Sequence, residues 1–279
     1  PELSARQATP LIPVKNLVQG YVLLAEDNIV NQEVAKAMLA KLGFKVDIAN
    51  DGQQALDFIS KQRYDIVLMD CQMPVMDGFE ATAEIRKRYG NAITIVALTA
   101  NATEDDRNHC VEAGMDDFLS KPYTLNQLNE ILTKWQTINE SNQVIMMTES
   151  EIPKGNTVTP QLPLLNPILL DQIRSLDPAH GNELVNKILH AFLESAEGYI
   201  QLLNRAFNDN DAETIRKTAH TLKSSSANIG AESLSNVFKQ IEACGRSGEL
   251  TLLESLRSEM LPLYHQVIIE VKAILNQPR

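Results

Sequence analysis

At 279 residues, the chain has the length of one or two domains. Hydrophobic residues make up 44% of it, enough for packed cores, and the net charge of −11 argues against a nucleic-acid partner. The three cysteines, Cys71, Cys110 and Cys244, form no Cys-x-x-Cys pair, and no apolar run reaches the roughly 18 residues of a membrane helix. We therefore expect a cytoplasmic chain without a zinc site, a disulfide framework or membrane contact.

Residues 1–19 carry three prolines and little periodicity, which predicts an incoming linker. From residue 20 to about 136, short apolar runs alternate with segments of helical periodicity. The predicted strands are residues 21–25, 46–49, 66–69, 93–98 and 118–120. Five strand–helix units joined by right-handed crossovers predict a parallel sheet whose carboxyl ends all meet at one edge.

The polar residues that follow these strands converge on one chemistry. They are Glu26, Asp27, Asp70, Thr99 and Lys121. Carboxylates held side by side repel one another unless a cation neutralises them, and hard oxygen ligands suit Mg²⁺. A metal site, a hydroxyl and an ammonium around Asp70 suit phosphoryl transfer to a carboxylate.

Residues 20–136 resemble a receiver domain of two-component signalling. The resemblance rests on Glu26-Asp27-Asn28, Asp70, Met73-Pro74-x-Met76-Asp77-Gly78, Leu98-Thr99-Ala100 and Lys121-Pro122. It implies a flavodoxin-like (βα)5 fold with Asp70 as the phosphoacceptor.

The same resemblance assigns the remaining site residues. It implies that Asp27, Asp70 and the backbone carbonyl of Gln72 bind Mg²⁺, with Glu26 acting through water. Thr99 is then the switch hydroxyl, Lys121 the cation that senses the phosphate, and Phe118 the aromatic partner of the switch. For Phe118, a plain core aromatic is an equal alternative.

Residues 137–163 lose helical periodicity and contain three prolines, so we predict a flexible tether. From 164 to 279, apolar residues repeat at three and four, which predicts an all-α four-helix bundle with additions. The pattern after Asn182 fits one long helix or two with a break near Gly198. The last helix is expected to kink or break at Pro262.

One helix of this half has an unusual polar face. His220 lies beside the stripe of Ile215, Ala219 and Leu222, so we expect an exposed imidazole surrounded by cations. Lys223, three residues later, would hydrogen-bond the oxygens of a phosphoryl group on that imidazole. The phrase Ala219-His220-Thr221-Leu222-Lys223-Ser224 resembles the active helix of a histidine phosphotransfer domain, which implies that His220 becomes a phosphohistidine.

Together the two resemblances imply the C-terminal portion of a hybrid sensor histidine kinase, acting as a phosphorelay module. The implied partners are an upstream histidine kinase core and a downstream response regulator receiver. No part of the sequence resembles an ATP-binding kinase domain. The first residue is Pro1, which suggests a fragment whose parent protein carries a membrane anchor upstream.

Two other functions remain open from sequence. The receiver half could hold a partner protein near Phe118 and release it on phosphorylation. An aspartyl phosphatase is disfavoured, because such enzymes need an acid two residues after the nucleophile and position 72 is Gln.

The 27 residues from 137 to 163 span roughly 30 Å as a flexible coil, so the bundle can reach the receiver edge of its own chain. We expect the small residues around Ser224 to lie over the loop that follows Asp70. Lys121 and Lys223 would then approach the phosphoryl group from opposite sides.

Overall fold

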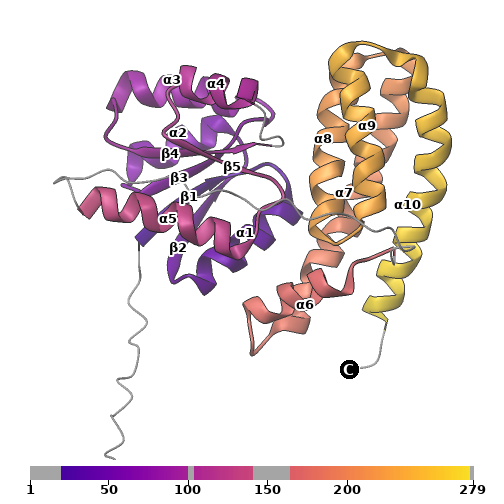
Figure 1. The fold of residues 1–279 in the computed structure, drawn as a ribbon, viewed down its shortest axis with the longest axis horizontal. Coiled ribbons are helices and arrows are strands. Elements are labelled where there is room, and N and C mark those ends of the chain that lie inside the picture. The colour runs from indigo at the N-terminus through magenta and orange to yellow at the C-terminus, as the bar shows by residue number, and fades with distance from the viewer. Residues whose placement is uncertain (1–19, 100–103, 141–163, 277–279) are drawn as a thin grey trace, which may run out of the picture.

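The structure is a computed structural model that describes residues 20–99, 104–140 and 164–276. The predicted linker at 1–19 and residues 141–163 of the predicted tether lie outside this described part. Figure 1 shows an α/β body formed by the first half and a helical body formed by the second.

The sheet of the α/β body places two strand ends beside each other. All neighbouring strands are parallel, in the order β2-β1-β3-β4-β5. The strands are β1 (Gly20–Ala25), β2 (Phe44–Ala49), β3 (Ile66–Asp70), β4 (Thr94–Thr99) and β5 (Asp117–Ser120). The chain leaves β1 for β2 on one side and returns to β3 on the other, so a crevice opens at the carboxyl ends of β1 and β3.

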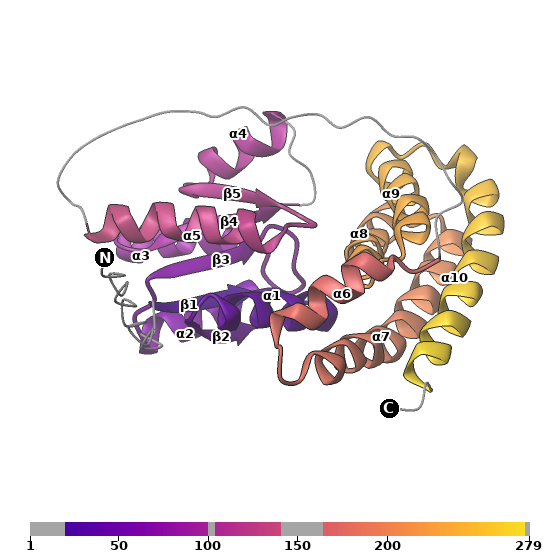
Figure 2. The ribbon, with the colours of Figure 1, turned by 60° about the horizontal axis from the view of Figure 1, so that its bottom comes forward.

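Helices cover both faces of this sheet (Figure 2). They are α1 (Ile29–Lys41), α2 (Gly52–Lys61), α3 (Gly78–Tyr89), α4 (Glu104–Glu112) and α5 (Leu125–Glu140). One core cluster joins the sheet to α1 and α5, and a second joins the other face to α2, α3 and α4. The predicted flavodoxin-like fold is confirmed.

The helical body is a closed bundle. Its helices are α6 (Pro167–Leu176), α7 (Gly181–Asp209), α8 (Ala212–Asn228), α9 (Glu232–Ser247) and α10 (Leu253–Leu275), with a 3₁₀ turn at Leu250–Leu252. Both α7 and α9 contact α8 and α10, which closes a four-helix core. The helical fold predicted for this half is confirmed. α7 runs through Gly198 without a break, and α10 continues through Pro262. Among the described helices, none combines the length and the apolar character that crossing a bilayer requires.

Helix α1 belongs to two cores. The side chain of Asn28 caps it by accepting hydrogen bonds from the backbone amides of Val30 and Asn31. Ala35 and Leu39 face the sheet, whereas Val30 and Val34 pack into the core of the bundle. The two bodies are therefore joined by buried apolar contacts that begin next to the carboxyl end of β1.

Candidate functional site

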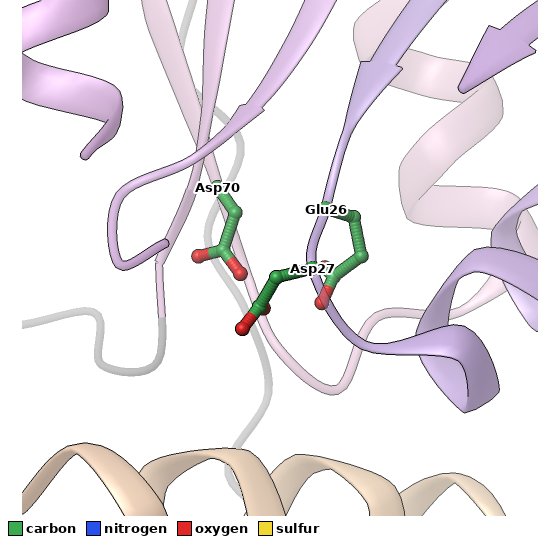
Figure 3. Close-up of side chains that lie close together, drawn as sticks. All are labelled: Glu26, Asp27 and Asp70. Carbon is green, nitrogen blue, oxygen red and sulfur yellow. The ribbon is translucent and has the colours of Figure 1, made fainter. Parts of the chain in front are cut away.

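Three carboxylates converge at the crevice between β1 and β3 (Figure 3). Glu26 and Asp27 follow β1, and Asp70 ends β3. One carboxylate oxygen from each residue lies within 4.8 Å of those of the other two. Glu26 is 1% exposed and Asp70 is 2% exposed. The structure thus brings together the acidic residues that sequence predicted at this edge.

Lys121, which directly follows β5, neutralises part of this charge. Its ammonium donates to Glu26 Oε2 at 2.6 Å and to Asp70 Oδ2 at 2.6 Å. Its backbone amide donates to the carbonyl oxygen of Thr99 at 2.7 Å, which fixes the start of the loop. Burial disfavours the ammonium, but the charges of Asp70 and Glu26 outweigh burial and raise the pKa of Lys121.

The ammonium of Lys121 does not balance all of the negative charge of the three carboxylates. Burial and the charge of Asp70 raise the pKa of Asp27 to about 6, although Lys121 opposes the shift. Burial likewise raises the pKa of Asp70, against the effect of Lys121. Three carboxylates face one ammonium, and all their oxygens are hard ligands. The donor set could therefore hold a divalent metal ion such as Mg²⁺.

The other predicted receiver residues surround this cluster. Thr99 is buried at the end of β4 and lies opposite Ser120 of β5. The backbone amide of Gln72 donates to Asp70 Oδ1 at 3.2 Å, which helps to orient the carboxylate. Phe118 is half-buried on β5, and the guanidinium of Arg107 lies 4.3 Å from the centre of its ring.

His220 differs from its predicted environment. We expected an exposed imidazole among cations, but His220 is buried, and only 5% of its surface is exposed. Nδ1 lies 3.0 Å from Glu242 Oε1 on α9. Among the described residues, Nε2 is buried without a hydrogen-bond partner. The neighbouring bundle helix and the α/β body together enclose the ring, and neither could be read from the pattern of α8 alone.

Glu242 is the site residue that sequence reasoning missed. Its carboxylate contacts His220, the ammonium of Lys223 and, at 3.2 Å, the guanidinium of Arg246. Burial alone would raise the pKa of Glu242, but the hydrogen bonds and charges of His220 and Lys223 hold it at about 2. The sequence feature that could have indicated Glu242 is its position four residues after the core residue Phe238, which places an acid on the buried side of α9.

Since Glu242 is ionised, it accepts a hydrogen bond, and a neutral His220 then carries its proton on Nδ1. The lone pair of the imidazole is left on Nε2. Lys223 faces Glu242 in this arrangement, and burial lowers its pKa despite the attraction of that carboxylate. Lys121 and Lys223 line one cavity, although each is paired with carboxylates of its own domain, and their approach to a phosphoryl group from opposite sides stays a prediction.

The acidic cluster and His220 share one interface. A cavity of about 530 Å³ is lined by Asp27 and Gln72 on one side and by Tyr199, Thr218 and His220 on the other. The positive charge on a protonated His220 would act directly on Asp70, since it lowers the pKa of that carboxyl. The two predicted phosphoacceptors therefore lie on facing sides of the contact between the two bodies.

Helix α8 contacts the α/β body mainly through polar side chains. The Asn28 amide donates to Ser225 Oγ at 2.6 Å and to the carbonyl oxygen of Thr221 at 3.3 Å. Asn228 donates to Asn31 Oδ1 at 2.8 Å. These hydrogen bonds run to the cap and first turn of α1. The prediction that Ser224 lies over the loop that follows Asp70 is wrong, because Ser224 lines a second cavity with Lys121 and Pro122, whereas that loop lines the cavity that contains Thr218 and His220.

Comparisons with known proteins agree on both halves. A family model for the response regulator receiver domain matches residues 22–133, and one for the Hpt domain matches residues 187–277. Aerobic respiration control sensor protein ArcB of Escherichia coli K12 is 32% identical over 225 residues, which cover 80% of this chain and 27% of that protein. Sensor histidine kinase GacS of Pseudomonas protegens is 31% identical over 242 residues, or 85% of this chain and 25% of that protein.

The chain thus spans about a quarter of the length of these curated relatives, 27% and 25%. Among solved structures, the receiver domain of sensor histidine kinase PA1611 from Pseudomonas aeruginosa PAO1 is 49% identical, with a TM-score of 0.40. That match covers 42% of this chain and 97% of the solved domain, which holds a magnesium ion in its active-site cleft.

Proposed function

We propose, from the premise that this chain carries a response regulator receiver domain followed by an Hpt domain, that it passes a phosphoryl group from Asp70 to His220 of the same chain. The chain is a phosphorelay module of the kind found in hybrid sensor histidine kinases. The observation that carries the proposal is that Asp27 of the acidic cluster and the residues directly after Asp70 line one interdomain cavity together with His220.

In this proposal Asp70 is the acceptor because it ends the central strand β3, binds Lys121 at 2.6 Å and lies beside the carboxylates of Glu26 and Asp27. One of its oxygens forms the bond to phosphorus, and the bond from phosphorus to the donor breaks. Lys121 then moves its hydrogen bond from the Asp70 oxygen to the phosphoryl oxygens. Thr99 lies at the end of the neighbouring strand β4, where its hydroxyl can also donate a hydrogen bond to a phosphoryl oxygen.

His220 is the second acceptor. Glu242 holds the Nδ1–H, so the Nε2 lone pair attacks phosphorus while the bond between phosphorus and the Asp70 oxygen breaks. Asp70 leaves as a carboxylate and returns to Lys121. No proton needs to leave Nε2, because the neutral tautomer already presents a lone pair there. Glu242 stabilises the positive charge that develops on the ring.

Asp27, Asp70 and the backbone carbonyl of Gln72 would hold Mg²⁺, with Glu26 acting through a water molecule. When bound, the ion would neutralise charge on the phosphoryl oxygens. Phe118 is proposed to follow the position of Thr99 on phosphorylation. Its ring is half-buried, and the guanidinium of Arg107 lies over it.

The partners follow from the chemistry. We propose that a histidine kinase core supplies the phosphoryl group and that the receiver of a separate response regulator removes it from His220. Both would act in the cytoplasm. The domain limits that we propose are 20–136 for the receiver and 164–279 for the Hpt domain, joined by 137–163.

The test is to label the full chain with radiolabelled acetyl phosphate and Mg²⁺ and to separate acyl phosphate from phosphohistidine by their stability to acid and alkali. A chain with His220→Gln should hold only acyl phosphate, and one with Asp70→Asn should hold no label. A mixture of the two variants should form phosphohistidine far more slowly than the unmodified chain at the same micromolar concentration. Equal rates would show that transfer occurs between chains.

A further inference from the structure

A chain of hydrogen bonds leads from the bundle to the metal-site carboxylates. Asn228, the last residue of α8, donates through Nδ2 to Asn31 Oδ1 at 2.8 Å. Asn31 donates through its own Nδ2 to Glu26 Oε1 at 2.8 Å. The other oxygen of Glu26 binds Lys121 at 2.6 Å. The Hpt domain thus reaches an acidic residue of the receiver without touching it directly.

The two inner members of this chain are sheltered from water, whereas Asn228 is half-buried. Asn31 is 6% exposed and Glu26 is 1% exposed, so few solvent molecules compete for their hydrogen bonds. In such surroundings one hydrogen bond polarises the next, and the donor bond from Asn31 strengthens when Asn228 binds its carbonyl oxygen. The bond from Asn228 therefore favours the orientation of Glu26 that the structure shows.

The net negative charge at the interface also links cation binding to packing of the bundle. Glu26, Asp27 and Asp70 carry three negative charges when ionised, and Lys121 returns one positive charge. Packing α7 and α8 across a cavity from Asp27 leaves less water to solvate the surplus than an open receiver edge would have. A divalent cation among the carboxylates cancels that surplus, so it should make packing of the bundle less costly.

We propose that Asn31 and Asn228 are positioning residues that couple packing of the Hpt domain to cation binding at Glu26, Asp27 and Asp70. The inference rests on the proposed function of this acidic cluster as a Mg²⁺ site. By reciprocity, if the packed bundle strengthens Mg²⁺ binding, Mg²⁺ strengthens packing of the bundle by the same factor. Phosphoryl transfer would then find the two domains together when the cation is present.

The test is a calorimetric titration of the full chain with Mg²⁺. Asn228→Ala removes the outer link at a position that holds no metal ligand, and it should weaken Mg²⁺ binding about three- to tenfold. Loss of a side chain that orients a ligand typically costs 10- to 100-fold, and Asn228 acts one residue further out. Asn31→Ala should weaken binding at least as much.

The variant that carries both substitutions tests the coupling more directly than either single variant. Because Asn228 acts through Asn31, adding Asn228→Ala to Asn31→Ala should cause no further loss of Mg²⁺ affinity. Gln240→Ala, at an exposed amide of α9, is the matched control and should leave the affinity unchanged. Circular dichroism of each variant checks that both domains are folded.

Two results would overturn the inference: unchanged Mg²⁺ affinity in folded Asn228→Ala, or independent losses that multiply in the double variant. Labelling of the same samples with acetyl phosphate at saturating Mg²⁺ tests the proposed function separately. If His220 still receives label while the Mg²⁺ affinity ignores Asn228, the coupling is wrong and the relay stands. If no label reaches Asp70 in the unmodified chain, the proposed function itself fails.

Discussion

Glu242 makes the most direct test of the proposed phosphohistidine site, because one carboxylate contacts His220, Lys223 and Arg246 together. Glu242→Gln keeps the shape and one acceptor oxygen but removes the charge. Glu242→Ala removes both and leaves the ammonium of Lys223 buried beside no acid, a loss of the kind that costs about 3–5 kcal/mol. We expect the Gln variant to fold and the Ala variant to be strongly destabilised.

The size of the charge effect follows from the pKa. The pKa of Glu242 falls from an ordinary value of 4.5 to about 2 in the folded chain, which corresponds to about 3 kcal/mol of stability. A depressed carboxyl pKa stabilises the fold fully above the unfolded value of 4.5 and loses that contribution as pH falls toward 2. At pH 3 about 2 kcal/mol of it should be gone.

The assay is urea denaturation followed by helical circular dichroism at pH 7 and at pH 3. The difference in unfolding free energy between the unmodified chain and Glu242→Gln should shrink by about 2 kcal/mol on going to pH 3. Glu259→Gln, at an exposed acid of α10, serves as the control and should show little such change. A difference between the chain and Glu242→Gln that is the same at both pH values would refute the reasoning.

Three further changes probe the rest of the molecule. Val34→Asp places a charge in the buried contact between α1 and the bundle, so transfer from Asp70 to His220 should slow at least tenfold while acetyl phosphate still labels Asp70. Undiminished transfer would mean that this contact is dispensable. Gly78→Ala should destabilise the receiver by several kcal/mol, because a Cβ there would lie 2.1 Å from the carbonyl oxygen of Asp70; thermal unfolding measures the loss. Asp27→Ala should weaken Mg²⁺ binding by at least tenfold in calorimetry, and full affinity in that variant would contradict its assignment as a ligand.

The receiver half could be predicted well because its signals are local. An uninterrupted apolar run identifies β3 as a strand buried on both faces, and all five of its residues are buried. Once the strands are parallel, the residues after β1, β3 and β5 must share one edge. Glu26, Asp70 and Lys121 therefore meet, although nothing in the sequence gives their 2.6 Å contacts.

The bundle half was less predictable because its site depends on contacts between helices. The periodicity of α8 placed His220 off its own apolar stripe, which is right for that helix alone. The pairing with Glu242 depends on how α9 packs against α8, and the receiver side of the His220 cavity is formed by Asp27 and the loop after Asp70. Val30 and Val34 show the same effect, since periodicity marks them as apolar without telling which core receives them.

The two-sided packing of α1 also restricts when outside proteins can act. Asp70 and His220 are both buried in this packed arrangement, so in the proposed relay a kinase core that brings phosphate, or a regulator that takes it away, would have to wait until the domains separate. If the closed arrangement held 99% of the molecules, either partner would bind roughly 100-fold more weakly than its contacts allow. The relay would then work in turns, with the closed interval reserved for internal transfer and the open interval for exchange with other proteins. The strength of one helix contact would set how the chain divides its time between them.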